Sequence, residues 1–273
     1  MKIFIRKGRI IVLFVSQFSG DELLVFNKLI TKVCTKLNEM FITRIIHEAD
    51  DEKLCFSTCL LIKASNTFEA ICLLIEKDLT IDAKALVRNL IEDAIVFKNI
   101  CLDESFFEEY IKCDILKQLP MINSWVDNFE ILSKYNDTLK EESFRQRKKE
   151  LDNMKNENNP MQALTKIKEL AKRAKLEGLY EITYRLLCED VHVNPRSLQE
   201  YFLLDMDNTI SGYKWKNQNN DRSRIIITAL DSFLLTMECM AYIFALEQED
   251  ALIKSYHKEL VEIGESIFEV LKD

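Results

Sequence analysis

Glycine and proline are scarce in this chain, which has 5 glycines and 3 prolines among 273 residues. Sandwiches, barrels and nucleotide-binding α/β folds need many tight turns, and tight turns draw on these two residues. Long stretches carry apolar residues at helical spacing instead, and 48% hydrophobic residues are enough to build a core. The sequence therefore predicts an all-α, multi-helix bundle. We assign 1–20 to a short N-terminal arm, 21–248 to the bundle domain and 249–273 to a C-terminal helix suited to oligomerisation.

The apolar periodicity and the helix-breaking residues also place the individual elements. Long helices are predicted over 21–49, 52–77, 81–101 and 222–246, the last as a central core helix. Pro120 and Pro160 are each expected in the first turn of a helix, where a proline costs least, and Gly178 is expected to break one. Residues 180–195 are predicted to be helical up to Pro195, 198–210 helical or half-helical, and 211–221 a polar loop.

Charge and cysteine content restrict the possible functions. The formal net charge of −8 provides no global basic field, so contact with RNA or DNA would need a local site. The eight cysteines include no CxxC pair, which favours reduced core thiols in a cytoplasmic protein. Cys55, Cys59 and His47 fall short of the four ligands of a structural zinc site, so we expect no metal and no cofactor.

The N-terminal segment differs in amino-acid composition from the rest of the chain. Lys2, Arg6, Lys7 and Arg9 precede an apolar run over 10–15. That run is far shorter than the ~20 apolar residues of a membrane-spanning helix, and we predict no membrane span. We interpret the segment as a β-prone arm that docks on a partner; a weak signal sequence or a membrane-surface role is the alternative.

The arrangement of side chains that best fits a catalytic site lies in residues 180–195, YEITYRLLCEDVHVNP. On a helix, Glu181, Arg185 and His192 fall within roughly a 40° sector at about 100° per residue, with Cys188 beside them. Histidine, with a usual pKa of ~6.5, transfers protons near neutral pH, and an arginine can hold a phosphate through two parallel hydrogen bonds. The structural alternative is an ordinary ion pair between Glu181 and Arg185, with His192 stabilised by the helix dipole.

Arg88 and Glu92 stand one turn apart among apolar residues of the segment 81–101. One interpretation is a surface ion pair that contributes a few tenths of a kcal/mol. The other is a half-buried polar cluster that faces the helix of Arg185 and His192, because charged groups among apolar neighbours need a partner.

These two segments together resemble an uncharacterised bacterial all-helical family known only as a domain of unknown function. In that family an Arg-x-x-x-Glu precedes a Tyr-x-x-Leu-Ser-x-x-Val-His-Pro-like segment, and Arg88, Glu92, Tyr184 and His192 match it. Cys188 stands where serine is usual, so a thiol replaces the hydroxyl at that position. The resemblance covers 51–246 and implies a helical fold.

The same helix resembles the HEPN superfamily of helical bundles, whose signature is an Arg, four to six residues and a His. Six residues separate Arg185 from His192, although Leu186 replaces the usual polar residue after the Arg. Many HEPN proteins are metal-independent ribonucleases of bacterial defence and toxin–antitoxin systems. The resemblance implies Arg185 and His192 as catalytic residues of a homodimer that acts on RNA, with a partner protein from the same operon. Arg88, Glu92, Tyr184 and Cys188 would shape the site. The alternative is a noncatalytic helical scaffold, interaction or ligand-sensing module of such a system.

Overall fold

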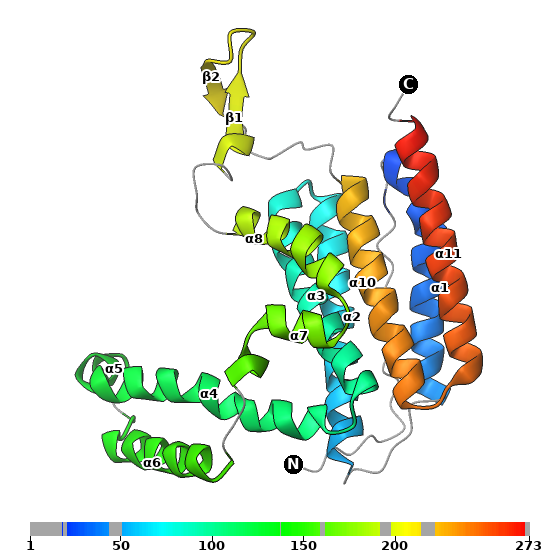
Figure 1. The fold of residues 1–273 in the computed structure, drawn as a ribbon. Helices are drawn as coiled ribbons and strands as arrows, with labels where there is room; N and C mark the ends of the chain where they lie inside the picture. The colour runs from blue at the N-terminus through cyan, green and yellow to red at the C-terminus, as the bar shows by residue number, and fades with distance from the viewer. Residues whose placement is uncertain are drawn as a thin grey trace. The chain divides into compact units, whose positions relative to one another are not determined.

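The computed structural model describes Phe18 and residues 21–43, 51–136, 138–158, 162–191, 198–213 and 222–270. It divides into two compact units, unit 1 with residues 1–101 and 178–273, and unit 2 with residues 102–177. Helices make up most of both units (Figure 1), which confirms the predicted all-α, multi-helix bundle. The prediction treated 21–248 as one bundle domain and did not anticipate this division.

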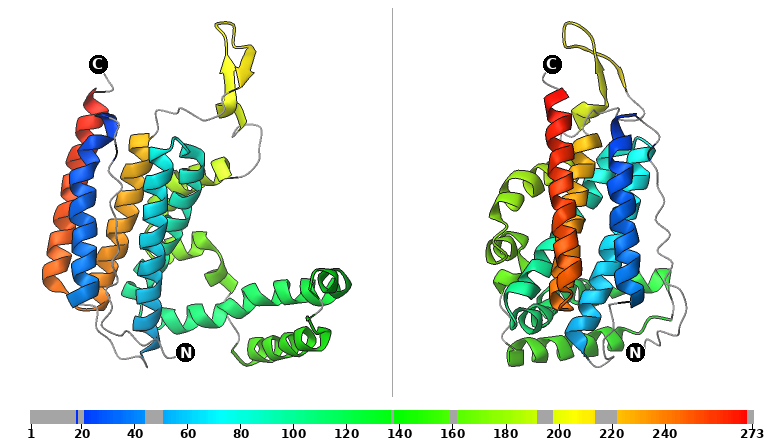
Figure 2. Two further views of the ribbon diagram at one scale, coloured as in Figure 1. Left: turned by 180° about the vertical axis from the view of Figure 1, so that it is seen from behind. Right: turned by 90° about the vertical axis from the view of Figure 1, so that its right-hand side faces the viewer.

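Unit 1 is built around the buried helix α10. Its long helices are α1 (Asp21–Thr43), α2 (Glu52–Glu76), α3 (Thr80–Leu102), α10 (Arg222–Ile243) and α11 (Glu247–Val270). Helix α10 packs against α1, α2 and α11 (Figures 1 and 2). Phe68 of α2 stacks on Phe233 of α10, with ring centroids 4.8 Å apart. The predicted core role of residues 222–246 is thereby confirmed.

Short-range signals in the sequence explain where α2 begins and ends. The Asp51 side chain accepts a hydrogen bond from the backbone N–H of Leu54 at 2.9 Å and so caps the helix. Asp78, at a φ of 61°, makes the turn into α3, and an Asp tolerates this left-handed conformation better than most residues.

By length and composition alone, α2 and α10 are the two helices among the described residues that could cross a membrane.

Helix α11 packs along α1 within the same chain (Figure 2). Lys32 of α1 pairs with Glu259 of α11 at 2.6 Å, and Lys36 of α1 lies 3.5 Å from Glu249 of α11. Each helix also contributes apolar side chains to the core, and Phe26 of α1 and Ile253 of α11 are both fully buried. The amphipathic helix α11 therefore packs against α1 of the same chain.

Unit 2 contains α4 (Phe106–Asp127), α5 (Phe129–Tyr135), α6 (Glu141–Asn158), the short 3-10 helix η1 (Gln162–Thr165) and α7 (Ile167–Arg173). The prediction that a helix begins at Pro120 was wrong, because Pro120 lies inside α4. An interior proline costs about 3 kcal/mol of helix stability. Leu119 and Ile122 on either side of it are buried in one apolar cluster with Leu151 of α6, and this packing compensates for the cost. Pro160 lies outside the described residues.

Arg173 joins the two ends of unit 2. Its guanidinium donates to Asp103 at 2.5 Å and to Glu109 at 2.9 Å, and it lies 5.1 Å from the ring centroid of Phe106. The hydrogen bond from Arg173, followed by those from Ser105, lowers the pKa of Asp103 to about 2. This carboxylate therefore stabilises the folded state above its usual pKa of ~3.9, and the contribution is lost as the pH falls toward about 2.

We expect Arg173→Met to raise the pKa of Asp103 toward its usual ~3.9, because the strongest of its hydrogen bonds disappears. An NMR titration of the side-chain carboxyl measures this directly. Asp205 provides the control, since its lowered pKa depends on the hydroxyl and backbone of Thr209 and should not respond to the change. An unchanged pKa of Asp103 would contradict the ion pair.

The segment predicted as helical or half-helical over 198–210 is mainly a β-hairpin, so that prediction was wrong. After the short 3-10 helix η3 (Gln199–Tyr201), β1 (Phe202–Leu204) pairs antiparallel with β2 (Ile210–Tyr213). The Asp205 carboxylate accepts hydrogen bonds from the backbone N–H groups of Asp207 and Thr209, at 3.0 and 2.9 Å. This side chain closes the turn and so outweighs the apolar periodicity that suggested a helix.

The predicted helix break at Gly178 was also wrong. Gly178 has helical dihedral angles, with φ −60° and ψ −44°. The break comes earlier, where α7 ends and Lys175 adopts a left-handed φ of 59°. Gly178 therefore belongs to the helical segment that carries the candidate site.

Candidate functional site

Four side chains from two distant parts of the sequence form a polar cluster in unit 1, which we call the Arg88 cluster: Arg88, Glu92, Tyr184 and Cys188. The Arg88 guanidinium donates to the Tyr184 hydroxyl at 2.8 Å and to the Cys188 sulfur at 3.1 Å. The Tyr184 hydroxyl in turn donates to Glu92 Oε1 at 2.6 Å, and this oxygen is 3.1 Å from Arg88 Nη2. The half-buried interpretation of Arg88 and Glu92 is therefore correct, and the cluster links α3 to α8 (Arg185–Val191) and the turn before it.

The charges within the Arg88 cluster stabilise one another. Burial alone would lower the pKa of Arg88, but the hydrogen bond to Cys188 and the charge of Glu92 outweigh it and the pKa is raised. Burial, and then the hydrogen bond to Glu92, raise the pKa of Tyr184. Arg88 is thus a cation and Tyr184 a neutral phenol at neutral pH. The arrangement is a closed network of donors and acceptors that holds two helices together.

The helix that carries Tyr184 begins with a π-helical turn, η2 (Leu179–Tyr184). Its hydrogen bonds span five residues instead of four, and such turns are frequent at functional sites. The Tyr180 ring stacks on the Tyr184 ring, with centroids 5.2 Å apart. The sequence analysis missed Tyr180 as a neighbour of the site; the four-residue spacing of Tyr180, Tyr184 and Cys188 is the signal that could have found it.

Arg185 does not join the Arg88 cluster. Its side chain is 65% exposed and its Nη1 donates to Glu181 at 2.7 Å, as the structural alternative predicted. Ile182 and Leu186, two apolar residues of the same helix, are 69% and 58% exposed. These side chains are exposed because Tyr184 and Cys188 face α3, where both bind Arg88. The opposite side of the helix therefore faces solvent. His192 lies outside the described residues.

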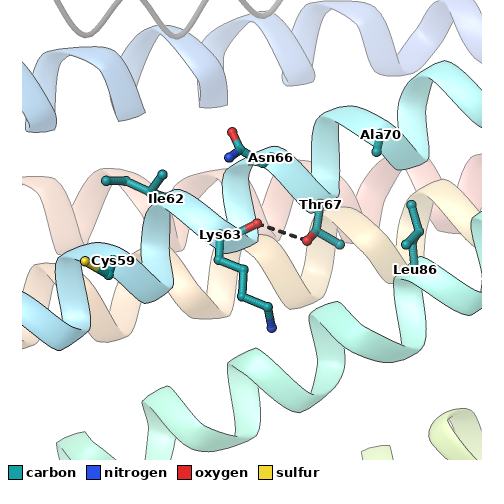
Figure 3. A pocket seen from close by; sticks show the side chains of 7 residues that line it. All are labelled: Cys59, Ile62, Lys63, Asn66, Thr67, Ala70 and Leu86. Atoms are coloured by element: carbon teal, nitrogen blue, oxygen red, sulfur yellow. Dashed lines mark hydrogen bonds between the residues drawn. The ribbon is translucent and has the colours of Figure 1, made fainter. Parts of the chain in front are cut away.

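The structure also reveals a charged pair that the sequence analysis did not identify. Lys63 of α2 donates to Asp93 of α3 at 2.5 Å, and Asp93 is almost fully buried. Burial raises the pKa of Asp93, and Lys63 opposes this effect. Lys63 also lines an open groove along α2 and α3 (Figure 3), together with Cys59, Ile62, Asn66, Thr67, Ala70 and Leu86. The polar groups of this groove are the Lys63 ammonium, which is paired with Asp93, the Asn66 amide, the Thr67 hydroxyl and the Cys59 thiol.

One of the eight cysteines, Cys188, belongs to the candidate site. All eight cysteines are free thiols, and four of them, Cys34, Cys72, Cys113 and Cys239, are buried. Across the described ranges, no group of three or more His, Cys, Asp or Glu side chains is placed to hold a metal ion. Cys188 is the cysteine that contacts the candidate site, through its sulfur and the Arg88 Nε.

The fold and the site define the class of protein: an all-α helical bundle in which an Arg-Glu-Tyr-Cys cluster joins two helices. The chain belongs to a family of unknown function (DUF5677), whose family model matches residues 55–210. The predicted membership of an uncharacterised family is thereby confirmed. The matched range contains the Arg88 cluster, Arg185 and His192. No curated protein and no solved structure matches the chain.

Proposed function

We propose that this protein is a HEPN-like, metal-independent endoribonuclease that acts in the bacterial cytoplasm as the effector of a defence or toxin–antitoxin system. The observation that carries the proposal is the position of Arg185. Its side chain is 65% exposed and stands seven residues before His192, and the same helix exposes the apolar side chains of Ile182 and Leu186. A phosphate can reach the cation, and a second copy of the chain can cover the apolar side chains.

The chemistry requires a base and a cation, and both can come from this helix. His192 would take the proton of the RNA 2′-hydroxyl, and Arg185 would stabilise the charge that develops on the phosphorane. Glu181 repels a phosphate, so the substrate must displace it from Arg185. A homodimer with two such helices face to face would supply the acid from one copy and the base from the other.

The Arg88 cluster would act as a positioning device for Arg185. Tyr184 directly precedes Arg185, and its hydroxyl is held by both Arg88 and Glu92. With Tyr184 fixed against α3, the next side chain along the helix is directed outward. A catalytic group displaced by about 1 Å can lose about a hundredfold in rate. The hydrogen bonds that hold Tyr184 would therefore support catalysis by keeping Arg185 in position.

The test is incubation of the purified protein with total RNA and tRNA in EDTA. Arg185→Ala should reduce the cleavage rate by about a hundredfold, as expected when a donor that stabilises transition-state charge is lost. His192→Ala should reduce it similarly. Arg145→Ala is the matched control, because Arg145 also sits in an exposed i,i+4 pair, with Glu141, and its side chain is 58% exposed. The control should cleave RNA as the wild type does.

A second candidate, a noncatalytic interaction module of such a system, is favoured by the closed Arg88 cluster and by the exposed Ile182 and Leu186. The same assay separates the two candidates. Absence of cleavage by the wild type, both alone and with the proteins of neighbouring genes, would exclude the ribonuclease and support the module. Cleavage that persists in Arg185→Ala and His192→Ala would reject the proposed catalytic residues.

A further inference from the structure

The β1–β2 hairpin presents an apolar face that no described residue covers. Phe202 pairs with Tyr213, and Leu204 pairs with Ile210 beyond a β-bulge between Leu203 and Leu204. The extra residue of the bulge places both pairs on the same face of the hairpin. Leu204, Ile210 and Tyr213 are 55%, 53% and 75% exposed. The rings of Phe202 and Tyr213 contact each other edge to face, with centroids 6.1 Å apart. Large apolar side chains gathered on one exposed face indicate a contact surface.

The hairpin also lacks a third strand among the described residues, where the sheet has two strands. An isolated two-stranded hairpin is marginally stable in water, and its outer edges present backbone groups that can pair with another strand. An extended segment that adds to one edge would satisfy these groups and continue the apolar face.

The charge of the hairpin restricts what can bind there. Asp205 and Asp207 are its two charged residues, and residues 202–213 contain no Lys, Arg or His. The hydrogen bonds from Thr209 lower the pKa of Asp205, so its carboxylate stays ionised at neutral pH. A complementary segment is therefore extended, apolar and basic.

One segment of this chain has that composition. Residues 1–17 contain four cations, Lys2, Arg6, Lys7 and Arg9, and the run IIVLFV over 10–15, whose residues favour β-strands. This segment lies outside the described residues. It leads directly into Phe18, whose backbone N–H and C=O each bond the Asn27 side chain at 2.9 Å. The segment is thus attached to unit 1 at α1, and 17 residues can reach about 55 Å when extended.

We propose that residues 1–17 dock on the β1–β2 hairpin by strand addition. The apolar run pairs with one edge of the hairpin and extends the face of Phe202, Leu204, Ile210 and Tyr213. The four cations approach Asp205 and Asp207. This inference is independent of the proposed ribonuclease activity.

The test is photo-crosslinking in the full chain, with Tyr213→p-benzoylphenylalanine, a change that keeps the exposed ring. After irradiation and digestion, mass spectrometry should find the label joined to a peptide within residues 1–17 of the same chain. The control carries the same label in place of Tyr135, an exposed tyrosine of unit 2. Labelling of residues 1–17 from position 213 no stronger than from position 135 would overturn the proposal. A covalent dimer joined hairpin to hairpin would also overturn it, and would identify a second copy as the occupant.

Charge reversal tests the electrostatic part of the same inference. Arg6→Glu with Lys7→Glu should reduce the yield of the Tyr213 crosslink by about threefold, the size expected for exposed ion pairs. Asp207→Lys added to these two changes should restore part of the yield, and Asp207 is chosen because Asp205 is needed for the turn. A yield that responds to neither change would reject the charge complementarity.

Discussion

Arg88→Met should lower the free energy of unfolding of unit 1 by about 3 kcal/mol, the lower end of the range for breaking a buried charged pair. The substitution keeps most of the side-chain length but removes the hydrogen bonds to Tyr184 and Cys188 and the ion pair with Glu92. Glu92 is then left beside a buried phenol without its cation. Water reaches the edge of Glu92, so the effect should not exceed this lower end.

Arg185→Met is the matched control for this prediction, because it makes the same chemical change four residues from Glu181 on an exposed surface. Exposed i,i+4 pairs contribute about 0.3–0.5 kcal/mol, so the two variants should differ several-fold in effect. Hydrogen exchange of the backbone amides of α3, measured in both variants, reports the stability of unit 1 directly. Equal losses in the two variants would show that the Arg88 cluster does not hold α3 to α8.

The fold could be predicted from the sequence because few signals contradicted the helical periodicity. Scarce glycine and proline, together with long amphipathic or apolar segments, indicate long helices, and α2, α3 and α10 begin and end close to the predicted positions. The failures occurred where a tertiary or side-chain contact outweighs the local signal. Packing of Leu119 and Ile122 carries α4 through Pro120, and the Asp205 carboxylate closes a hairpin where the periodicity suggested a helix.

The candidate site could be predicted only in part, for a geometric reason. Arg88 and Glu92 were recognisable as charges among apolar neighbours, and Tyr184 and Cys188 followed from the resemblance to a family. The side of the helix that faces outward was not predictable, because a constant 100° per residue takes no account of the π-helical turn at Leu179–Tyr184. That turn, with the hydrogen bonds of Tyr184 to α3, leaves Ile182 and Leu186 exposed beside Arg185.

Phe233→Ala should lower the free energy of unfolding of unit 1 by about 4 kcal/mol, within the range for a buried phenylalanine replaced by alanine. The ring is 1% exposed and stacks on Phe68 with an interplanar angle of 7°. The loss therefore includes the transfer of a large apolar side chain, the cavity left beside Phe68 and the ring contact itself. Helix α10 packs against α1, α2 and α11, so the cavity opens where these elements meet and cannot close by a shift of one helix.

Hydrogen exchange of the α10 amides is the measurement for Phe233→Ala, because unfolding of unit 2 does not enter it. Tyr242→Ala is the control: it removes an aromatic ring of similar size from an exposed position of α10 itself, and surface changes of this kind stay within about 0.5 kcal/mol. Phe233→Leu, which fills much of the same volume, should recover more than half of the loss. If Phe233→Ala instead costs no more than Tyr242→Ala, α10 cannot be the centre of the core, and the packing of α2 on α10 through Phe68 would have to be abandoned.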